Sequence, residues 1–362
     1  MSKKKSKSQN TQNSFIKLAF EQAKINLGST GTNPAVGCVI EKNGAIISSA
    51  HTAVGGRPHA EFIALKKNID FKDSNLYVTL EPCNHYGLTP PCTNIITKKN
   101  IKKVYFSISD YDNRTSNLSI KILSKKKIIV KKNLLEKYAK SFYESYYLNK
   151  IKNLPLIDAK IAVSKDFYSK SKKNRFITNK YSLSRAHLIR SQYECIVSTS
   201  KSINEDNSLL NCRIEGLTNK SPKIIIIDRF LKLKRNLDMF KSKSKIYLLT
   251  TIFDKKKIVS YKKKGINVLS FKTMNNQRDF FTIFDFIRKI GGTRILVESG
   301  VTFLDFLLNN NFINNIFIFQ SNSFLLKNGL KPFNKDKFKN IRKSNQIRTN
   351  LFNDKLYKIK IK

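Results

Sequence analysis

The sequence has no tryptophan and only 13 glycines among 362 residues, and it contains no run of eighteen apolar residues. The missing apolar run excludes a transmembrane helix, which needs about 20 predominantly apolar residues in succession. The basic N-terminus, "MSKKKSKSQN", has no apolar segment behind it, which argues against a secretory signal peptide. We therefore predict a disordered basic tail over residues 1–12, and a remnant of a transit peptide is the alternative.

Acidic residues are also scarce: 25 Asp and Glu stand against 69 Lys and Arg, which gives a formal net charge of +44. Nucleic-acid binding is one interpretation, because basic surfaces attract phosphates. The lysines, however, are spread along the whole chain, in "KKNIKK", "SKKKIIVKK" and "YKKKG". We favour compositional drift of the surface and expect neither a nucleic acid nor a membrane as partner. Anionic small substrates are compatible with both interpretations.

Cysteines are few and follow no regular framework. An odd number of them indicates a reducing compartment, which we predict to be the cytoplasm. Only two of the five lie in a motif, and the others are interpreted as small buried hydrophobic side chains. The five are Cys38, Cys83, Cys92, Cys195 and Cys212.

The length and the 40% of hydrophobic residues allow two domains, each with its own core. In the first half, helical spacing predicts a helix over 14–27 that is capped by Ser14, and Asn43-Gly44 predicts a hairpin between two strands. Further along, strand-like and helix-like segments alternate, which predicts an α/β fold with a mainly parallel sheet.

The second half shows the same alternation without sharing a motif with the first. Helices are predicted in "SRAHLIRSQ", "FTIFDFIRKI" and "VTFLDFLLNN". Pro155, within the connection "IKNLPLIDAK", marks the boundary, so the predicted domains are 13–150 and 156–362. Strands are predicted in "LIDAKIAV", "ECIVS", "KIIIID", "SKIYLLT", "INVLSF", "RILVE", "NIFIFQ" and "DKLYKIKIK".

Four residues of the first half form a chemical motif. The segment "RPHAEFIAL" (57–65) supplies His59 and Glu61 at a predicted helix start, and "LEPCNHYGLTPPC" (80–92) supplies Cys83 and Cys92. Two thiolates and one imidazole are an ordinary ligand set for Zn²⁺, and three protein ligands leave a fourth position for water. We therefore predict one catalytic zinc per chain, with Glu61 as the group that moves the proton of the water.

The order His-x-Glu, Pro-Cys and a second Cys is typical of the zinc deaminases. In deaminases of nucleobases and nucleic acids, two residues usually separate the cysteines, whereas eight residues, "NHYGLTPP", do so here. A purely structural zinc is the alternative to a catalytic one.

Together these motifs resemble one family, the bifunctional deaminase–reductases of bacterial riboflavin biosynthesis. The matching segments are "PHAE" at 58–61, "TLEPC" at 79–83 and "TPPC" at 89–92. Members of this family also have eight residues between the two cysteines. The segment "NPAVGCVI" (33–40) matches as well, which implies that Asn33 contacts the pyrimidine. The resemblance implies a cytidine-deaminase-like N-terminal domain and a dihydrofolate-reductase-like C-terminal domain that uses NADPH.

In the second half the resemblance rests on "KIAVSKD" (160–166), "RFIT" (175–178), "DNSLLNCR" (206–213) and "VESGVTFLDF" (297–306). No G-x-G-x-x-G occurs, so a Rossmann site is not supported, but Gly300 before a helix offers backbone N–H groups to a phosphate. The resemblance implies cofactor contacts by Ala162, Phe176, Ser202, Asp206, Arg229, Gly300, Val301, Thr302, Phe303, Leu304, Asp305 and Phe306. It implies substrate contacts by Asn174, Arg190, Leu210, Arg213 and Glu298.

The chain departs from the family pattern at several positions. Leu88 stands where the family often has a basic residue that faces the substrate phosphate, and an uncharged side chain cannot supply that contact. Phe176 replaces a Trp, which keeps the aromatic face but loses the indole donor. Asn174 replaces a Ser, Ser208 a Pro, and Arg229 a small polar residue near the cofactor.

The predicted function has two steps. A diaminopyrimidinone that carries a ribosyl phosphate is first deaminated by hydrolysis, and NADPH then reduces the ribosyl chain to a ribityl chain. Two rival hypotheses are a nucleic-acid-binding or tRNA-editing zinc deaminase and a deaminase whose reductase half has decayed. The expected partner is the small phosphorylated substrate, and a homo-oligomer is compatible with the sequence.

Overall fold

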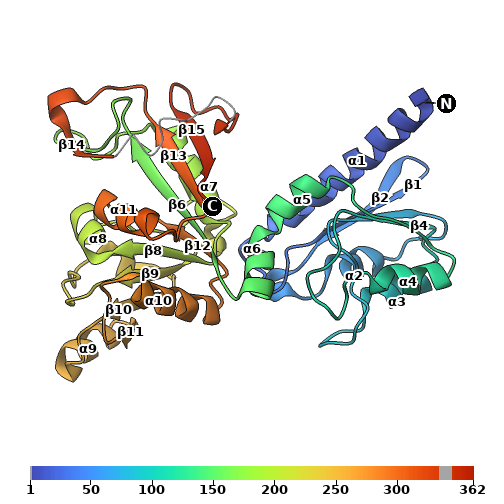
Figure 1. The fold of residues 1–362 in the computed structure, drawn as a ribbon, viewed down its shortest axis with the longest axis horizontal. Coiled ribbons are helices and arrows are strands. Elements are labelled where there is room, and N and C mark those ends of the chain that lie inside the picture. Colours follow the sequence, from blue (N-terminus) through green and yellow to red (C-terminus); the bar gives the residue numbers. More distant parts are fainter. Residues whose placement is uncertain (1, 334–344) are drawn as a thin grey trace. The chain divides into compact units, whose positions relative to one another are not determined.

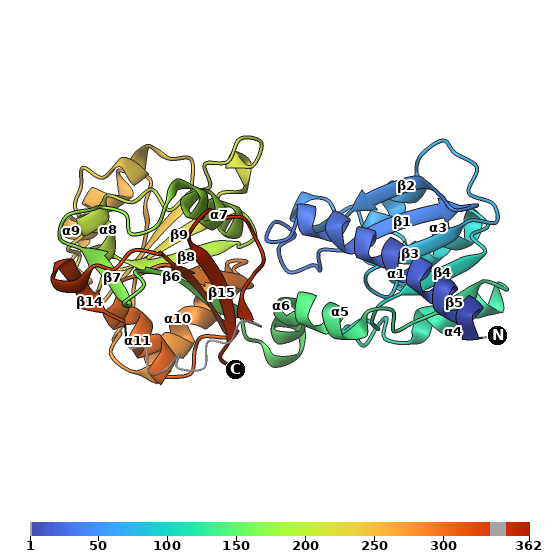
Figure 2. The same cartoon turned by 90° about the horizontal axis from the view of Figure 1, so that it is seen from above.

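The computed structural model describes residues 2–333 and 345–362, with side chains from residue 10 onward. The chain forms two compact units, Met1–Asn153 and Leu154–Lys362 (Figures 1 and 2). The break lies next to Pro155, within the connection that the sequence analysis marked as a boundary. Within the part of the chain that is described, no helix has the length and apolar character needed to cross a bilayer.

A five-stranded sheet of order β2-β1-β3-β4-β5 forms the centre of the N-terminal unit. β1 pairs antiparallel with β2 and β3, whereas β3, β4 and β5 run parallel. Asn43 and Gly44 have φ of 53° and 85°, as a tight hairpin turn requires, so the predicted hairpin is confirmed. The strands are β1 (Gly37–Lys42), β2 (Ala45–His51), β3 (Asn75–Val78), β4 (Lys103–Phe106) and β5 (Ile129–Lys131).

Helices cover both faces of this sheet (Figure 1). α1 (Ser2–Ile25) and α5 (Glu136–Phe142) lie on one face, and α2 (Ala60–Leu65), α3 (Cys92–Lys98) and α4 (Leu118–Lys125) lie on the other. After α5 the chain continues through α6 (Glu144–Tyr147) into a π-helical turn (Leu148–Lys152). The helix predicted to start near His59 is present as α2, and the alternation of strand-like and helix-like segments predicted after it is present in β3, α3 and β4. α4 and β5 had no predicted counterpart.

The first helix differs from its prediction at its start. α1 begins at Ser2, so residues 2–12, predicted as a disordered tail, belong to the helix, and Met1 lies outside the described residues. Lysine is a good helix former, which is compatible with this extension. The Ser14 hydroxyl donates to the carbonyl of Asn10 at 3.1 Å from inside the helix, so the prediction that Ser14 is the cap was wrong.

An eight-stranded sheet of order β11-β10-β9-β8-β12-β6-β13-β15 forms the C-terminal unit. Every pair of neighbours is parallel except β13 with β15. All eight predicted strands are present: β6 (Leu156–Val163), β8 (Cys195–Thr199), β9 (Lys223–Ile227), β10 (Ile246–Thr250), β11 (Asn267–Ser270), β12 (Arg294–Val297), β13 (Asn315–Gln320) and β15 (Lys355–Lys360). The sequence analysis missed the small sheet of β7 (Tyr168–Ser171) and β14 (Gly329–Pro332).

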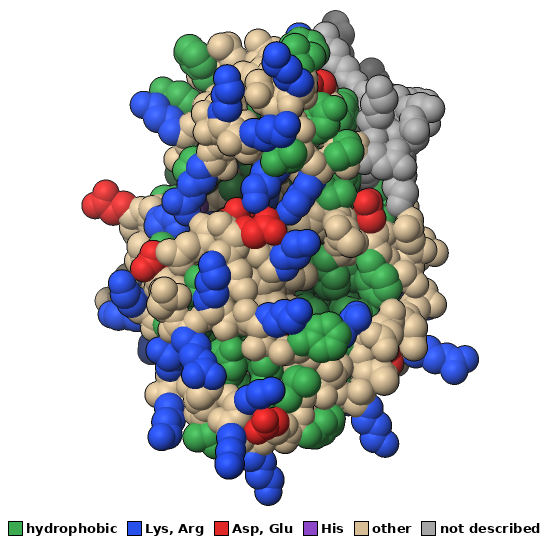
Figure 3. All heavy atoms as spheres, turned by 90° about the vertical axis from the view of Figure 1, so that its left-hand side faces the viewer, with side chains coloured by type: hydrophobic (Ala, Val, Ile, Leu, Met, Phe, Trp, Pro, Cys, Tyr) green, Lys and Arg blue, Asp and Glu red, His purple; other side chains and the backbone are tan. Residues whose placement is uncertain are grey.

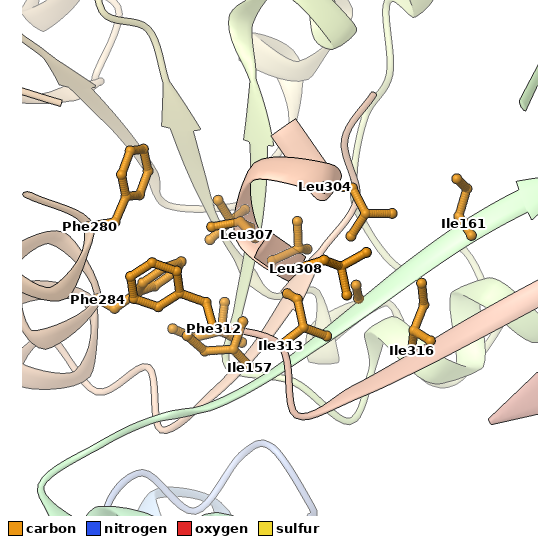
Figure 4. Close-up of a cluster of buried hydrophobic side chains, with 14 of the residues drawn as sticks. Ile157, Ile161, Phe280, Phe284, Leu304, Leu307, Leu308, Phe312, Ile313 and Ile316 are labelled. Atoms are coloured by element: carbon orange, nitrogen blue, oxygen red, sulfur yellow. The ribbon is translucent and has the colours of Figure 1, made fainter. Parts of the chain in front are cut away.

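Alternating side chains of the central strands build two cores, one on each face of this sheet. Ile225 packs toward α10 (Gln277–Lys289) and α11 (Val301–Asn309), where the phenylalanines and leucines of Figure 4 meet the sheet. Ile224 and Ile226 point to the opposite face, which is covered by α7 (Lys180–Arg190), α8 (Ser200–Asp206) and α9 (Lys255–Lys262). The apolar run "KIIIID" is therefore a strand buried on both sides.

The excess of positive charge is dispersed. On the face drawn in Figure 3, Lys and Arg side chains are scattered over the whole surface between uncharged atoms, and acidic side chains are few. A surface that binds along a nucleic-acid backbone is expected to carry a basic stripe, and this face shows no single stripe of that kind.

Candidate active sites

Three of the four motif residues of the N-terminal unit lie at the starts of two helices. His59 is the N-cap of α2, with an extended backbone (φ −71°, ψ 156°), and Glu61 lies in the first turn with 3% of its surface exposed. Cys92 is the first residue of α3, and Cys83 lies in the segment that follows β3. Residues 84–91, which connect the two cysteines, are called the cysteine loop below.

The three predicted metal ligands converge. The Nδ1 atom of His59 lies 3.4 Å from Sγ of Cys83 and 3.5 Å from Sγ of Cys92. All three ligand atoms lie within 4.8 Å of one another. The backbone N–H of Cys92 donates to Sγ of Cys83 at 3.3 Å, which favours the thiolate form of Cys83. Two sulfurs and one imidazole nitrogen that face one point fit a zinc ion, and no fourth protein ligand joins the cluster among the described residues.

The electrostatics of the cluster distinguish its groups. The hydrogen bond shared with Cys92 is the largest factor that lowers the pKa of the Cys83 thiol to about 4. The same shared bond, together with burial, raises the pKa of Cys92. Burial raises the pKa of Glu61 to about 7, although the nearby His59 opposes this shift. Glu61 is therefore a buried carboxyl that can both accept and release a proton near neutral pH.

Buried hydrogen bonds fix the strand end that leads to Cys83. Glu81 accepts from the backbone N–H groups of Asp110, Asn117 and Ser119 at 3.2, 2.9 and 3.2 Å, and from the Ser119 hydroxyl at 2.6 Å. Thr79 Oγ1 lies 2.6 Å from the Tyr143 hydroxyl and accepts from the backbone of β1. Carboxylate and hydroxyl groups thus anchor the segment "TLEPC" to its neighbours.

Asn33 lies against the turn that leads to His59. Its Nδ2 atom is 3.5 Å from the carbonyl of Gly56, and a Cβ atom on Gly56 would come within 2.4 Å of it. Gly56 also has φ of 87°, which favours glycine. The next residue, Arg57, extends to the cysteine loop, where its Nη1 atom donates to Thr89 Oγ1 at 2.9 Å. The sequence analysis did not single out Arg57.

The C-terminal unit contains a cavity of about 720 Å³ beside β6, α7 and α8. Most of the residues that the resemblance named for the reductase line it, although their positions in the sequence are far apart. Phe176 is 55% exposed, and the Arg175 guanidinium lies 5.3 Å from the centre of its ring. The named residues in the lining are Ala162, Asn174, Phe176, Arg190, Ser202, Asp206, Leu210, Arg213, Glu298 and Gly300.

A mostly buried charge cluster forms one wall of this cavity. Arg190 donates to both oxygens of Glu298, at 2.6 and 2.9 Å, and Nζ of Lys160 lies 3.6 Å from Glu298. Burial alone would raise the pKa of Glu298, but the charges of Arg190 and Lys160 outweigh it and lower this pKa to about 2. Burial, followed by Arg190 and Arg213, lowers the pKa of His187, another lining residue, to about 4.

The sequence analysis missed Lys160 and His187 as cavity residues. Lys160 carried a signal, because it interrupts the otherwise apolar second half of "LIDAKIAV", a strand that packs on both sides. A lysine inside such a strand needs a buried partner. The signal of His187, a lone histidine within a helix, was not specific.

Other named cofactor residues lie outside the lining. Val301 and Leu304 are 8% and 2% exposed and their side chains pack in the core, so only their backbone is available for the predicted cofactor contacts, which stay a prediction. Phe303 and Phe306 pack against the same core. Arg229 donates to the carbonyl of Met274 at 2.5 Å. Thr302 and Asp305 are absent from the lining as well.

Within the lining, the Gly300 N–H donates to Ser202 Oγ at 2.9 Å, which brings the starts of α8 and α11 together.

The two halves match two known families. The family described as the cytidine and deoxycytidylate deaminase zinc-binding region matches residues 9–108, which include His59, Glu61, Cys83 and Cys92. The RibD C-terminal domain family matches residues 155–351, more than half of the chain. The fold and the sites thus define a chain that joins a deaminase-type zinc domain to an α/β reductase-type domain of the dihydrofolate-reductase-like class. The chain belongs to the RibD C-terminal domain family.

Whole-chain relatives agree with this assignment. The riboflavin biosynthesis protein RibD of Aquifex aeolicus is 29% identical over 308 residues, which cover 84% of this chain and 85% of that protein. RibD of Actinobacillus pleuropneumoniae is 29% identical over 311 residues, 83% of this chain and 81% of the relative. The fold is similar to that of the diaminohydroxyphosphoribosylaminopyrimidine deaminase/5-amino-6-(5-phosphoribosylamino)uracil reductase of Thermotoga maritima, with a TM-score of 0.81, 24% identity and coverage of 98% and 99%.

Proposed function

We propose that the chain is a bifunctional enzyme of riboflavin biosynthesis. Its N-terminal unit removes an amino group by hydrolysis from a diaminopyrimidinone that carries a ribosyl phosphate. Its C-terminal unit then reduces the ribosyl chain to a ribityl chain with NADPH. The observation that carries the proposal is the convergence of His59, Cys83 and Cys92 beside buried Glu61, in one chain with a RibD-type reductase domain.

In the deamination, we assign His59, Cys83 and Cys92 to hold zinc, which when bound acidifies a water molecule. Glu61 accepts one proton of the water and delivers it to the ring nitrogen, and it then moves the second proton, from the added hydroxyl, to the amino group that departs as ammonia. Its burial suits this role, because a carboxyl with a pKa of about 7 exchanges protons readily at neutral pH. Asn33 is assigned to orient the pyrimidine.

In the reduction, NADPH when bound supplies a hydride for the anomeric carbon of the opened ribose. We assign Arg190, Glu298 and Lys160 to the substrate side of the cavity, where a fixed cluster of charges positions polar groups without needing to reorganise. Phe176, Ser202 and Gly300 are assigned to the cofactor side. We assign most of the rate to positioning, because the Glu298 carboxylate in the lining is already paired with Arg190 and Lys160.

The predicted compartment and partners remain part of the proposal. All five cysteines are free, which is compatible with the cytoplasm that the sequence analysis predicted. A small phosphorylated substrate remains the proposed partner. The rival interpretation as a nucleic-acid deaminase is not favoured, because it gives no role to the reductase-type domain that makes up more than half of the chain.

The experiment that tests the proposal is mass detection of products from the phosphorylated diaminopyrimidinone, with and without NADPH. Without NADPH, the product should have lost one amino group in exchange for oxygen, with release of ammonia. With NADPH, it should also gain two hydrogens. Tight, steeply salt-dependent binding to generic RNA together with inactivity on the pyrimidine would favour the nucleic-acid rival instead.

A further inference from the structure

The guanidinium of Arg57 lies along the cysteine loop. Nη1 donates to Thr89 Oγ1 at 2.9 Å, and Nη2 lies 3.3 Å from the point where a Cβ atom on Gly87 would stand. The Arg57 guanidinium thereby lies beside the loop on both sides of Leu88. The arginine precedes His59 by two residues, and Thr89 precedes Cys92 by three. A cation is thus fixed on the segment that connects the metal ligands.

The backbone around Arg57 is equally well fixed. The N–H of Gly55 donates to the carbonyl of Ser29 at 2.8 Å, and the N–H of Ala53 donates to the carbonyl of Pro58 at 3.1 Å. Gly56 packs against Asn33, the residue assigned to the pyrimidine. Arg57 therefore directly follows the glycine that packs against the ring-orienting residue, and it precedes the first metal ligand by two positions.

This charge has no acidic partner among the described residues. Arg114 and Arg190 each form an ion pair with a carboxylate, at 2.6 Å in both cases, whereas the hydrogen-bond partner of Arg57 is the neutral Thr89. The side chain is only partly buried, so its remaining N–H groups can reach a ligand. A guanidinium held in this way is suited to an anion with several oxygens, such as a phosphate.

We infer that Arg57 binds the phosphate of the deaminase substrate, with Thr89 as the residue that orients it. The inference rests on the proposed function and names the contact that recognises the phosphorylated form. Leu88, on the same loop, is 88% exposed and uncharged, so it brings no cation of its own. The cation comes instead from the turn before His59, the first metal ligand, and not from the cysteine loop between the second and third ligands.

The test compares two substrates and three variants of the full-length, zinc-loaded protein. The substrates are the phosphorylated diaminopyrimidinone and its riboside without the phosphate. The variants are Arg57→Gln, Arg57→Lys and, as a matched loss of charge, Lys66→Gln, which removes an exposed lysine at the end of α2. Ammonia release gives KM and kcat, and zinc content and circular dichroism check that each variant is folded and loaded.

Arg57→Gln should raise KM for the phosphorylated substrate about tenfold or more with little change in kcat, because a charge-assisted hydrogen bond is lost far from the reacting carbon. For the riboside, KM should stay the same. Arg57→Lys should give a KM for the phosphorylated substrate between those of the unmodified protein and Arg57→Gln, because lysine keeps the charge but not the planar guanidinium. Lys66→Gln should change neither substrate's KM.

Equal effects of Arg57→Gln on both substrates, or no effect on either, would overturn the inference. A loss of zinc or of kcat in Arg57→Gln would also count against it, because that result assigns Arg57 to the support of the loop. Failure of the proposed function gives a different result: the unmodified protein then releases ammonia from neither substrate.

Discussion

The metal site of the N-terminal unit draws its four groups from two short segments, 57–65 and 80–92, whereas the lining of the C-terminal cavity comes from positions spread between 160 and 331. In the first site each segment contributes two groups, and helix starts hold them together. In the second, a strand, several helices and several loops each contribute one or a few residues. A compact motif shows its chemistry in the sequence, whereas a dispersed site becomes visible only when the chain is folded.

The two sites also stabilise charge differently. In the metal cluster, burial raises the pKa of Glu61 to about 7, so the acid stays able to exchange its proton. In the cavity, two cations lower the pKa of Glu298 to about 2, so this carboxylate stays ionised. One buried glutamate is therefore suited to move protons and the other to hold cations in place. Exchanging each for glutamine separates these roles.

The largest expected effect comes from Glu61→Gln. Glutamine keeps the size of the side chain and removes only the proton transfer, so deamination should fall by about a hundred- to ten-thousandfold. Zinc content and NADPH oxidation on the deaminated substrate should be retained. Ammonia release and metal analysis measure the result, with Glu136→Gln, which changes a partly exposed glutamate at the start of α5, as control. Near-normal turnover of the zinc-loaded variant would contradict the assigned role.

Cys83→Ser should reduce the zinc content far below one per chain, and deamination should fall with it, because a weak hydroxyl ligand replaces a thiolate. Cys38→Ser is the matched control, since Cys38 is a buried free cysteine of β1 outside the metal cluster. NADPH oxidation on the deaminated substrate should survive in both variants. Full zinc content in Cys83→Ser would show that the site is not the one described.

Glu298→Gln should destabilise the C-terminal unit by about 3 kcal/mol at pH 7, because it leaves Arg190 and Lys160 as buried cations without an anion. The folded-state pKa of Glu298 is about 2 and its ordinary value is 4.5, so its stabilisation is complete above pH 4.5 and is lost as the pH falls toward 2. The difference between the variant and the unmodified protein should shrink over that range. Denaturant unfolding at several pH values measures it.

Glu205→Gln is the control for this prediction. The Glu205 carboxylate also pairs with two lysines, Lys170 and Lys331, at 2.8 and 3.0 Å, but it is 31% exposed. Solvent screens such a pair, so its loss should cost less than about 1 kcal/mol. Equal destabilisation by the two variants would show that burial does not distinguish the two clusters.

The smallest expected effect comes from Leu88→Lys. A new exposed charge on the cysteine loop should lower the deaminase KM by up to about fivefold at low salt, and less as salt is raised. In the Arg57→Gln background the same change should restore part of the lost affinity. Steady-state kinetics at two salt concentrations measures this change in KM. An unchanged KM in both backgrounds at low salt would show that no phosphate lies near this loop.

The parts that sequence could predict were those with a local signal. The Asn43-Gly44 turn, the apolar run of β9 and the set of His59, Glu61, Cys83 and Cys92 each follow from a few adjacent residues. The pairing of Lys160 with Glu298 could not be predicted, because it joins β6 to the residue after β12, two segments far apart in the chain. The cofactor contacts expected of Val301 and Leu304 followed from a sequence match, and the match could not show that their side chains face the core.

The Glu81 carboxylate, which accepts three backbone N–H groups from the segment after β4, has a consequence for how that segment exchanges hydrogen with water. The amides of Asp110 and Asn117 belong to no strand or helix, and amides in such segments usually exchange within the fastest class. Here a buried side chain takes the place of a neighbouring strand as acceptor. These two amides should therefore exchange as slowly as those of the sheet, and a deuterium label would mark them as part of its rigid frame.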